Sequence, residues 1–141
     1  MVKKLICAFM AFGIVFCNAL AVDAETAPVY EEIDNPRFQQ ITSMSAGLTI
    51  SDSGYARCTG TVSLRPGYNV RATVALYEIG NGSWDLVHSW TGTGSGPLGA
   101  NVSNGWWVVH GTYIVEVTAY VTDSAGNYIE SPTVQSYIDT Y

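Results

Sequence analysis

Positive charge is scarce in this chain. Lys3 and Lys4 are its only lysines, and six basic residues face twelve acidic ones, for a formal net charge of −6 at pH 7. An acidic surface repels phosphate backbones, which argues against nucleic acid as a partner. The same shortage leaves no basic patch for an anionic lipid surface.

Patterns of catalytic residues are missing as well. There is no G-x-S-x-G nucleophile elbow, and the sequence places no carboxylate beside either His88 or His110. The segment Gly94–Gly99 has the spacing G-x-G-x-x-G, but the run from Pro97 to Val102 predicts a strand where a nucleotide site needs a helix. We therefore expect no enzyme, no metal site and no cofactor. A small hydrolase that uses one of the histidines is the catalytic alternative.

The first residues have the features of an export signal. Two lysines precede the apolar run Leu5–Phe16, and the small residues Val22-Asp23-Ala24 follow where a signal peptidase cleaves. We predict a signal peptide at residues 1–24, a secreted mature chain that starts near Glu25, and no membrane association after cleavage. The alternative is an uncleaved anchor, because the run Leu5–Val22 approaches the roughly 20 residues of a spanning helix.

Cleavage would leave one cysteine. Cys7 and Cys17 belong to the predicted leader, so Cys58 has no partner for an internal disulfide. From Ala56 to Leu64, every second residue, Cys58 included, is small or apolar, and the intervening residues are polar. Free cysteine packs like a small hydrophobe, so we predict a buried, inert thiol. An intermolecular bridge is the alternative.

Alternation of apolar and polar residues recurs along the rest of the chain and predicts the fold. Its period of two is typical of strands with one buried face. Turn-forming segments interrupt the alternating runs, and no run has the period of a helix. We predict one all-β antiparallel sandwich of about seven strands over residues 41–141. The alternating runs start at Met44, Ala56, Val70 and Tyr113, and the predicted turns are Asp52–Gly54, Arg65–Gly67, Gly80–Gly82, Gly92–Gly99, Asn104-Gly105 and Asp123–Asn127.

The last third of the chain favours an immunoglobulin-like or fibronectin-III-like sandwich. Tyr113 follows Gly111 at the start of the penultimate long strand, the position of a tyrosine corner, in which the hydroxyl bonds to nearby backbone. The alternative is an ordinary core tyrosine. The turn Asp123–Asn127 is predicted to close a hairpin, with Gly126 at positive φ. Pro132 predicts an edge strand or a break.

Several short segments, spread over roughly residues 37–135, together form a recognisable order. They are Ser45–Ser51, Cys58–Val62, Gly67–Val70, Trp84 and Trp90–Gly94, and Gly111–Tyr113 through Gly126. In this order they resemble an uncharacterised family of small secreted proteins from Gram-positive anaerobic bacteria. The resemblance implies export and an immunoglobulin-like β-sandwich, and it carries no activity or functional residue to this chain.

Residues 25–40 differ from the rest. Acidic residues crowd between Pro28 and Pro36, with little apolar surface to bury, which predicts a flexible acidic arm that leads to the first strand. A short docking segment for a partner is the alternative, because disordered arms can order on binding.

Aromatic residues are the best candidates for a binding site. The chain has four tryptophans and nine tyrosines, and sugars stack on exposed aromatic rings. Trp84 and Trp90 share one face if residues 84–91 form a regular strand. That face is either core, which its apolar character favours, or an exposed platform with the two rings about 20 Å apart. Trp107 is adjacent to Trp106, so at least one of that pair is predicted to be exposed, and Tyr120 lies on a polar strand face.

The tentative ligand-binding residues are therefore Trp107, Trp84, Trp90 and Tyr120. Taken together, the sequence predicts a secreted, non-catalytic binding module that acts at the cell surface or outside the cell as a monomer or weak homo-oligomer. Its expected ligand is an extracellular glycan or a surface protein. The alternative is a structural or matrix component that self-associates without a discrete ligand.

Overall fold

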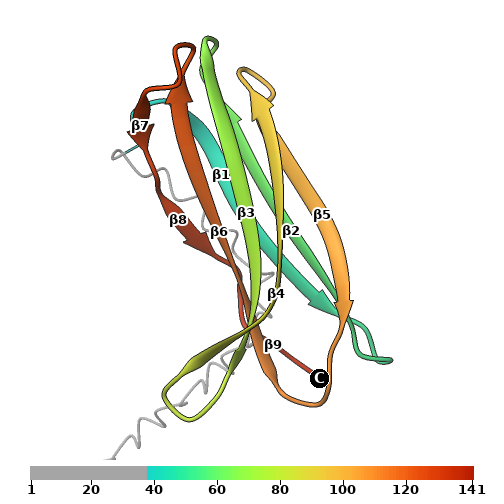
Figure 1. Ribbon diagram of the computed structural model, residues 1–141. Helices are drawn as coiled ribbons and strands as arrows, with labels where there is room; N and C mark the ends of the chain where they lie inside the picture. The colour runs from blue at the N-terminus through green and yellow to red at the C-terminus, as the bar shows by residue number, and fades with distance from the viewer. Residues whose placement is uncertain (1–37) are drawn as a thin grey trace, which may run out of the picture. The chain divides into compact units, whose positions relative to one another are not determined.

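The structure, a computed structural model, describes residues 38–141. They form two antiparallel sheets and no helix, and therefore contain no helix that could span a membrane (Figure 1). The signal peptide predicted at residues 1–24 and most of the predicted arm, residues 25–37, lie outside the described residues.

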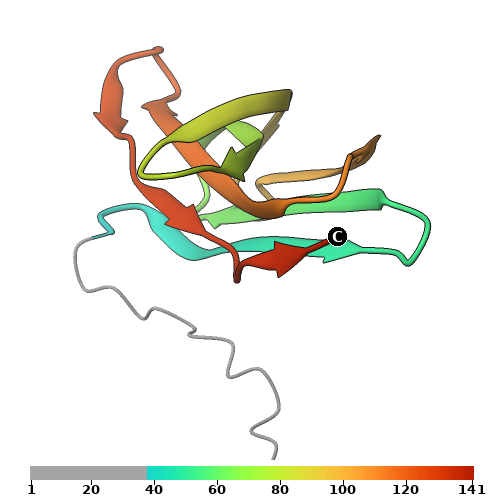
Figure 2. The ribbon, with the colours of Figure 1, turned by 90° about the horizontal axis from the view of Figure 1, so that it is seen from below.

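The smaller sheet has the strand order β1-β2-β5, and the larger has the order β4-β3-β6-β7, with β8 and β9 also paired to β6. Figure 2 shows the two sheets as separate layers. The predicted fold class, a fibronectin-III-like antiparallel sandwich, is confirmed. The strands are β1 (Ile41–Ile50), β2 (Tyr55–Leu64), β3 (Tyr68–Ile79), β4 (Trp84–Ser95), β5 (Ala100–Trp107), β6 (Thr112–Asp123), β7 (Tyr128–Glu130), β8 (Thr133–Gln135) and β9 (Asp139–Thr140).

The structure has nine strands where the sequence predicted about seven. The difference arises at the end of the chain, where one expected strand is divided into the three short strands β7, β8 and β9. Pro132 lies between β7 and β8, at the predicted break, and its carbonyl accepts a hydrogen bond from the amide of Ala119 in β6. A proline cannot donate to the ladder, so the pairing partner of β6 changes at this point.

The core lies between the sheets and follows the predicted alternation. Cys58 is fully buried, as predicted. Gly60 is the point of closest approach between the layers, because a Cβ there would lie 2.5 Å from Cγ2 of Val74 and 2.8 Å from Cγ2 of Val117. The residues of β2, β3 and β6 that form the core cluster between the sheets are Ala56, Cys58, Val62, Leu64, Val70, Ala72, Val74, Leu76, Tyr113, Val115, Val117, Ala119 and Val121.

Tyr113 forms the predicted tyrosine corner. Its side chain is buried, and its hydroxyl donates a hydrogen bond of 2.7 Å to the carbonyl oxygen of Val109. Burial raises the pKa of this hydroxyl, and the nearby charge of Glu78 raises it further. The phenol therefore stays protonated as a donor and fixes the loop that leads into β6.

One predicted turn is wrong, and another is shorter than predicted. Of the predicted turn Gly92–Gly99, the first four residues belong to the end of β4, and the chain reverses at Gly96–Gly99. Asn104-Gly105 lies inside β5, where Gly105 pairs with Arg57 and its amide bonds the side chain of Asn104. In both segments glycine allows close packing of a neighbouring side chain and does not mark a turn. A Cβ at Gly92 would lie 2.7 Å from Cγ2 of Val102.

A buried carboxylate joins the two sheets at the start of β1. Glu130, at the end of β7, accepts hydrogen bonds from the backbone amides of Gln39 at 2.9 Å, Gln40 at 2.8 Å and Ile41 at 3.3 Å. Phe38 packs against the core. The last residues assigned to the predicted arm are therefore attached to the sandwich.

Candidate ligand-binding surface

The tryptophans of β4 do not share a face. A β-bulge interrupts the pairing of β3 with β4, because Leu76 pairs with His88 and the next residue, Tyr77, pairs with Leu86. Val87 is the extra residue, and it packs toward the core together with Trp90. Trp84, on the other side of the bulge, points outward and is 43% exposed. Both predicted arrangements, a shared core face and a shared exposed platform, are wrong.

Trp90 belongs to an aromatic cluster near the edge where β4 passes β5. Its ring meets His88 edge-on with the ring centroids 4.7 Å apart, and His88 stacks on Trp106 of β5 at 4.0 Å. Trp90 is partly buried against the core, and Trp106 is 42% exposed. This cluster fills space between the sheets, which is a packing role.

Trp107 lies on the outer face of the small sheet, with 66% of its surface exposed. It meets Tyr55 of β2 edge-on at 5.0 Å. The ring of Tyr55 lies over Gly105, since a Cβ at that glycine would overlap the Tyr55 ring and hydroxyl. The prediction that at least one of the adjacent tryptophans is exposed is confirmed, because both Trp106 and Trp107 are exposed.

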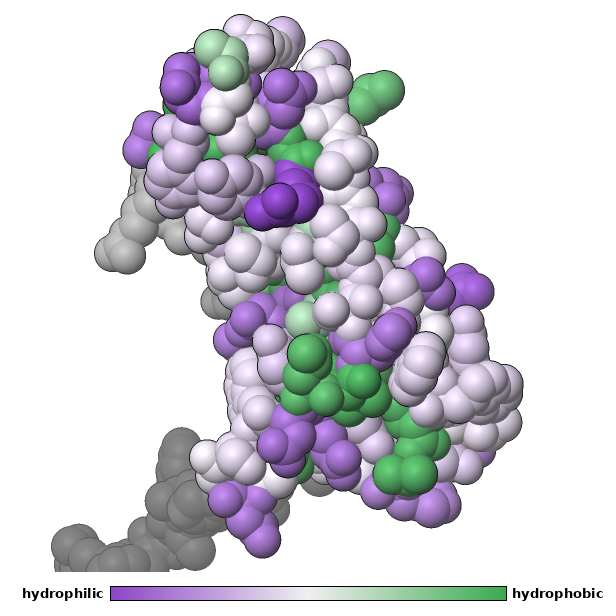
Figure 3. Space-filling model, in the orientation of Figure 1, coloured by the Kyte–Doolittle hydropathy of each residue, from purple (hydrophilic) through white to green (hydrophobic). Residues whose placement is uncertain are grey.

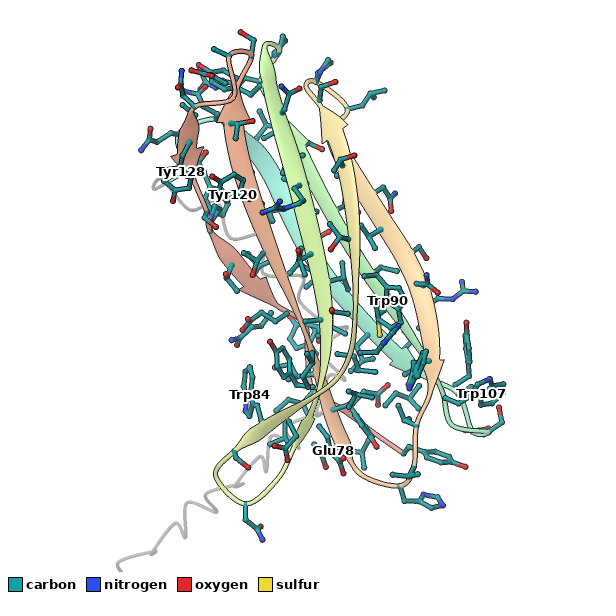
Figure 4. The ribbon with its side chains drawn as sticks, viewed as in Figure 1. Glu78, Trp84, Trp90, Trp107, Tyr120 and Tyr128 are labelled. Atoms are coloured by element: carbon teal, nitrogen blue, oxygen red, sulfur yellow. The ribbon has the colours of Figure 1, made fainter. Side chains whose placement is uncertain are left out.

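Tyr120 has two partners that give its surroundings the character of a binding site. Tyr128, which is 57% exposed, lies next to it across the β6–β7 hairpin, with ring centroids 5.3 Å apart. The guanidinium carbon of Arg71 in β3 lies 5.0 Å from the centroid of the Tyr120 ring. We call Arg71, Tyr120 and Tyr128 the tyrosine face. Figure 4 shows both tyrosines at the opposite end of the large sheet from Trp84.

The hairpin geometry explains why the two tyrosines meet. The turn Asp123–Asn127 holds Gly126 at φ 87°, as predicted, and Asp123 accepts bonds from the amides of Ala125 and Asn127. An irregularity between Val121 and Thr122 then places Thr122 opposite Tyr128. Asn127 donates hydrogen bonds to the Asp123 carboxyl, and these bonds lower the pKa of that carboxyl. The bond from the Asn127 side chain has the larger effect, and the bond from its backbone amide comes second.

A shallow concavity adjoins the tyrosine face. Its volume is about 460 Å³, which falls within the range of small-molecule sites, and its walls come from β3, β4 and β6. Hydroxyl, amide and guanidinium groups occur in its lining beside apolar carbon surface, so it offers donors, acceptors and apolar contact together. The lining residues are Asn69, Val70, Arg71, Thr93, Gly94, Ser95, Tyr120 and Thr122.

Hydroxyl groups continue across the same face below the concavity. Thr91, Thr73, Thr118 and Thr133 form one row across four strands. Thr73 and Thr91 are joined by a 3.5 Å hydrogen bond, and Thr118 and Thr133 by one of 3.0 Å. In Figure 3 the hydrophobic surface gathers in the lower half, whereas this upper half is mainly pale or purple.

Comparison with known proteins does not identify the chain. No family model matches it, and no curated protein matches it. The fold and the surface geometry are therefore the basis for a functional proposal.

The remaining reactive groups have structural surroundings. Burial raises the pKa of the Cys58 thiol to about 12, so the nucleophilic thiolate is not populated at neutral pH. His88 stacks on Trp106 and meets Trp90 edge-on, and His110 stacks on Tyr141 at 4.2 Å. Within residues 38–141, no three His, Cys, Asp or Glu side chains are grouped as metal ligands.

The structure distributes the four predicted site residues over separate places. Trp107 lies on the small sheet, Trp90 between the sheets, and Trp84 and Tyr120 at opposite ends of the large sheet. Trp84 is opposite Ile79 and Tyr120 opposite Arg71, which separates them by about 26 Å along β3. Sequence reasoning missed Arg71 and Tyr128. Their signals were an arginine between two apolar residues in an alternating strand, and a tyrosine on each side of one turn.

Proposed function

We propose that the chain is a secreted, non-catalytic module that binds carbohydrate through the tyrosine face. One observation carries this proposal: Tyr120 and Tyr128 lie side by side next to Arg71, at the margin of a concavity lined by hydroxyl and amide groups. A surface protein was the other class of ligand expected from the sequence, and the mixture of hydrogen-bonding groups and apolar surface in the concavity favours the glycan.

The chemistry of a sugar ring suits this surface. A pyranose presents C–H groups on its faces and hydroxyls around its rim, so it needs a flat apolar contact surrounded by hydrogen-bonding groups. The exposed ring of Tyr128 supplies the first, and Asn69, Thr93 and Thr122 supply the second. A protein partner instead favours a buried apolar centre with few hydrophilic groups.

Location outside the cell rests on the sequence alone. The basic and apolar leader at residues 1–24 supports secretion. The resemblance of several segments to small secreted proteins of Gram-positive anaerobes supports export and carries no role to this chain. We propose a location outside the cell on these grounds.

A glycan array probed with the purified chain tests the proposal. Any hit is then measured by isothermal titration with Tyr128→Ala and, as a matched control, Trp107→Ala on the small sheet. We expect Tyr128→Ala to weaken binding at least tenfold, or about 1.4 kcal/mol, and Trp107→Ala to leave it unchanged. Binding that depends on Trp107 alone, or no binding to any glycan, contradicts the proposal.

Self-association without a ligand is the second candidate. The feature that favours it is β1, whose ten residues lie at the edge of the small sheet, where a strand can add another chain. Sedimentation velocity over a wide concentration range distinguishes the two candidates. A concentration-dependent rise in mass together with a negative glycan array favours the structural role, and a constant monomer favours the binding module.

A further inference from the structure

Arg71 is a positive charge in neutral surroundings. It points outward from β3, and its cross-strand partners are Thr93 on β4 and Tyr120 on β6. The adjacent outward positions on its own strand are Asn69 and Thr73. Within residues 38–141, the guanidinium packs on the Tyr120 ring rather than against a carboxylate.

The acidic groups nearest to this surface are engaged elsewhere. Glu116 is four residues before Tyr120, about 13 Å along β6, and its carboxylate bonds the side chain of Gln135. Asp123 is held by Asn127 and by two backbone amides of its turn. The Glu130 carboxylate accepts three amides at the start of β1. Each acid has partners of its own, and Arg71 lines the concavity.

We propose that the glycan bound at the tyrosine face carries a carboxylated sugar, whose carboxylate is received by Arg71. The inference rests on the proposed carbohydrate function. A planar guanidinium presents two parallel N–H donors that match the two oxygens of a carboxylate, and charge-assisted hydrogen bonds of this kind are about twice as strong as neutral ones. The sugar ring then lies on Tyr128, beside the Tyr120 ring that carries the guanidinium, and its hydroxyls face Asn69, Thr93 and Thr122.

The charge of the whole protein narrows the ligand further. With a formal net charge of −6, the protein repels a densely charged polyanion. A single carboxylate in contact with Arg71 is attracted at short range, and salt screens its repulsion from the distant acids. The ligand is therefore a glycan in which an acidic sugar, a uronic or sialic acid by class, lies among neutral residues.

The test uses pairs of glycans that differ only in charge. Oligosaccharides that contain glucuronic, galacturonic or sialic acid are compared with their methyl esters, together with neutral and sulfated analogues, by isothermal titration at two salt concentrations. The wild-type chain should bind the acid at least tenfold more tightly than its ester, and the preference should shrink at high salt. The variant Arg71→Gln should bind acid and ester equally, at the affinity of the wild type for the ester.

A matched variant controls for charge alone. Arg57→Gln removes one positive charge from the outer face of the small sheet and should keep the full preference for the acid. Equal binding of acid and ester by the wild type overturns the inference but leaves the carbohydrate function standing. A preference for sulfated sugars over carboxylated ones, or one that survives in Arg71→Gln, also overturns it. Failure of every glycan to bind overturns the carbohydrate function itself.

Discussion

The outer faces of the two sheets both carry an aromatic pair beside small polar side chains, yet they use the rings differently. On the small sheet, Tyr55 lies flat over Gly105, and Trp107 meets its edge. On the large sheet, Tyr120 and Tyr128 stand beside each other at a concavity. A ring that covers its own backbone is already occupied. The difference teaches that exposure of an aromatic pair does not make a binding face, and that the rings must also be free of the sheet beneath them.

The largest expected effect comes from Glu130, where the two sheets depend on each other. In Glu130→Ala the amides of Gln39, Gln40 and Ile41 lose their acceptor, and Ile41 is buried, so we expect a loss of about 2–3 kcal/mol in the free energy of unfolding. Urea denaturation measures it. Glu116→Ala, which removes an acid from the outer face, should cost less than about 0.5 kcal/mol. Equal losses in the two variants would contradict the role given to Glu130.

A smaller loss is expected at Gly105, and it should affect the small sheet alone. The added methyl group in Gly105→Ala overlaps the Tyr55 ring, which must lift away from β5. Because a side chain moves rather than the backbone, we expect a cost of about 1–2 kcal/mol. Chemical denaturation gives the cost, and near-ultraviolet circular dichroism reports the changed environment of Trp107. An unchanged spectrum would mean that Tyr55 does not rest on this glycine.

Removal of one ring from each face should separate stability from binding. Tyr55→Ala exposes Gly105 and breaks the contact with Trp107, so we expect it to lower stability by about 1 kcal/mol and to leave glycan binding intact. Tyr128→Ala should change stability by less than about 0.5 kcal/mol and weaken the binding at least tenfold. Thermal unfolding and titration of the same two variants decide the matter. If both variants lose the same property, the two faces are not distinct in function.

The smallest effect is the pH dependence of stability at the turn Asp123–Asn127, which adjoins the tyrosine face. Hydrogen bonds lower the pKa of Asp123 in the folded hairpin, so its contribution to stability is complete above the ordinary value of 3.8 and is lost as the pH falls through the folded value. We expect the amide protection factors of residues 123–128, which are exchange rates corrected for the intrinsic effect of pH, to fall as the pH drops below 3.8, before those of the core residues change. Proton exchange measured by nuclear magnetic resonance checks this. The variant Asp123→Asn should remove the pH dependence.

The alternating pattern predicted the core because β2, β3 and β6 contain no bulged residue of their own, the extra residues lying on their neighbours β1, β4 and β7. Cys58 and Tyr113 were assigned correctly for this reason, since the side of the sheet on which a residue lies depends only on parity within an unbroken strand. In β4 the bulge at Val87 reverses parity, and Trp84 and Trp90 fall on opposite sides. A one-residue bulge leaves no clear mark in a sequence, which explains the failure there.

The composition of the candidate site was only partly predictable. Tyr120 was chosen because it occupies a polar strand face, and that information is local to β6. Arg71 and Tyr128 join it through the register of β3 against β6 and through the irregularity after Val121. Register depends on how two distant segments align, so a single strand read alone cannot contain it.

The attachment of Gln39–Ile41 to Glu130 also has a mechanical consequence. Tyr128 and Glu130 are two residues apart in β7, so a ligand held by the tyrosine face and a tether that pulls at residue 38 meet within one short strand. Force between the two passes through the Glu130 hydrogen bonds and the β6–β7 hairpin, in parallel with the hydrogen bond that the Arg65 amide donates to the Gln40 carbonyl. We therefore expect these few bonds at the start of β1 to take up tension before the packed layers of β2, β3 and β6 do.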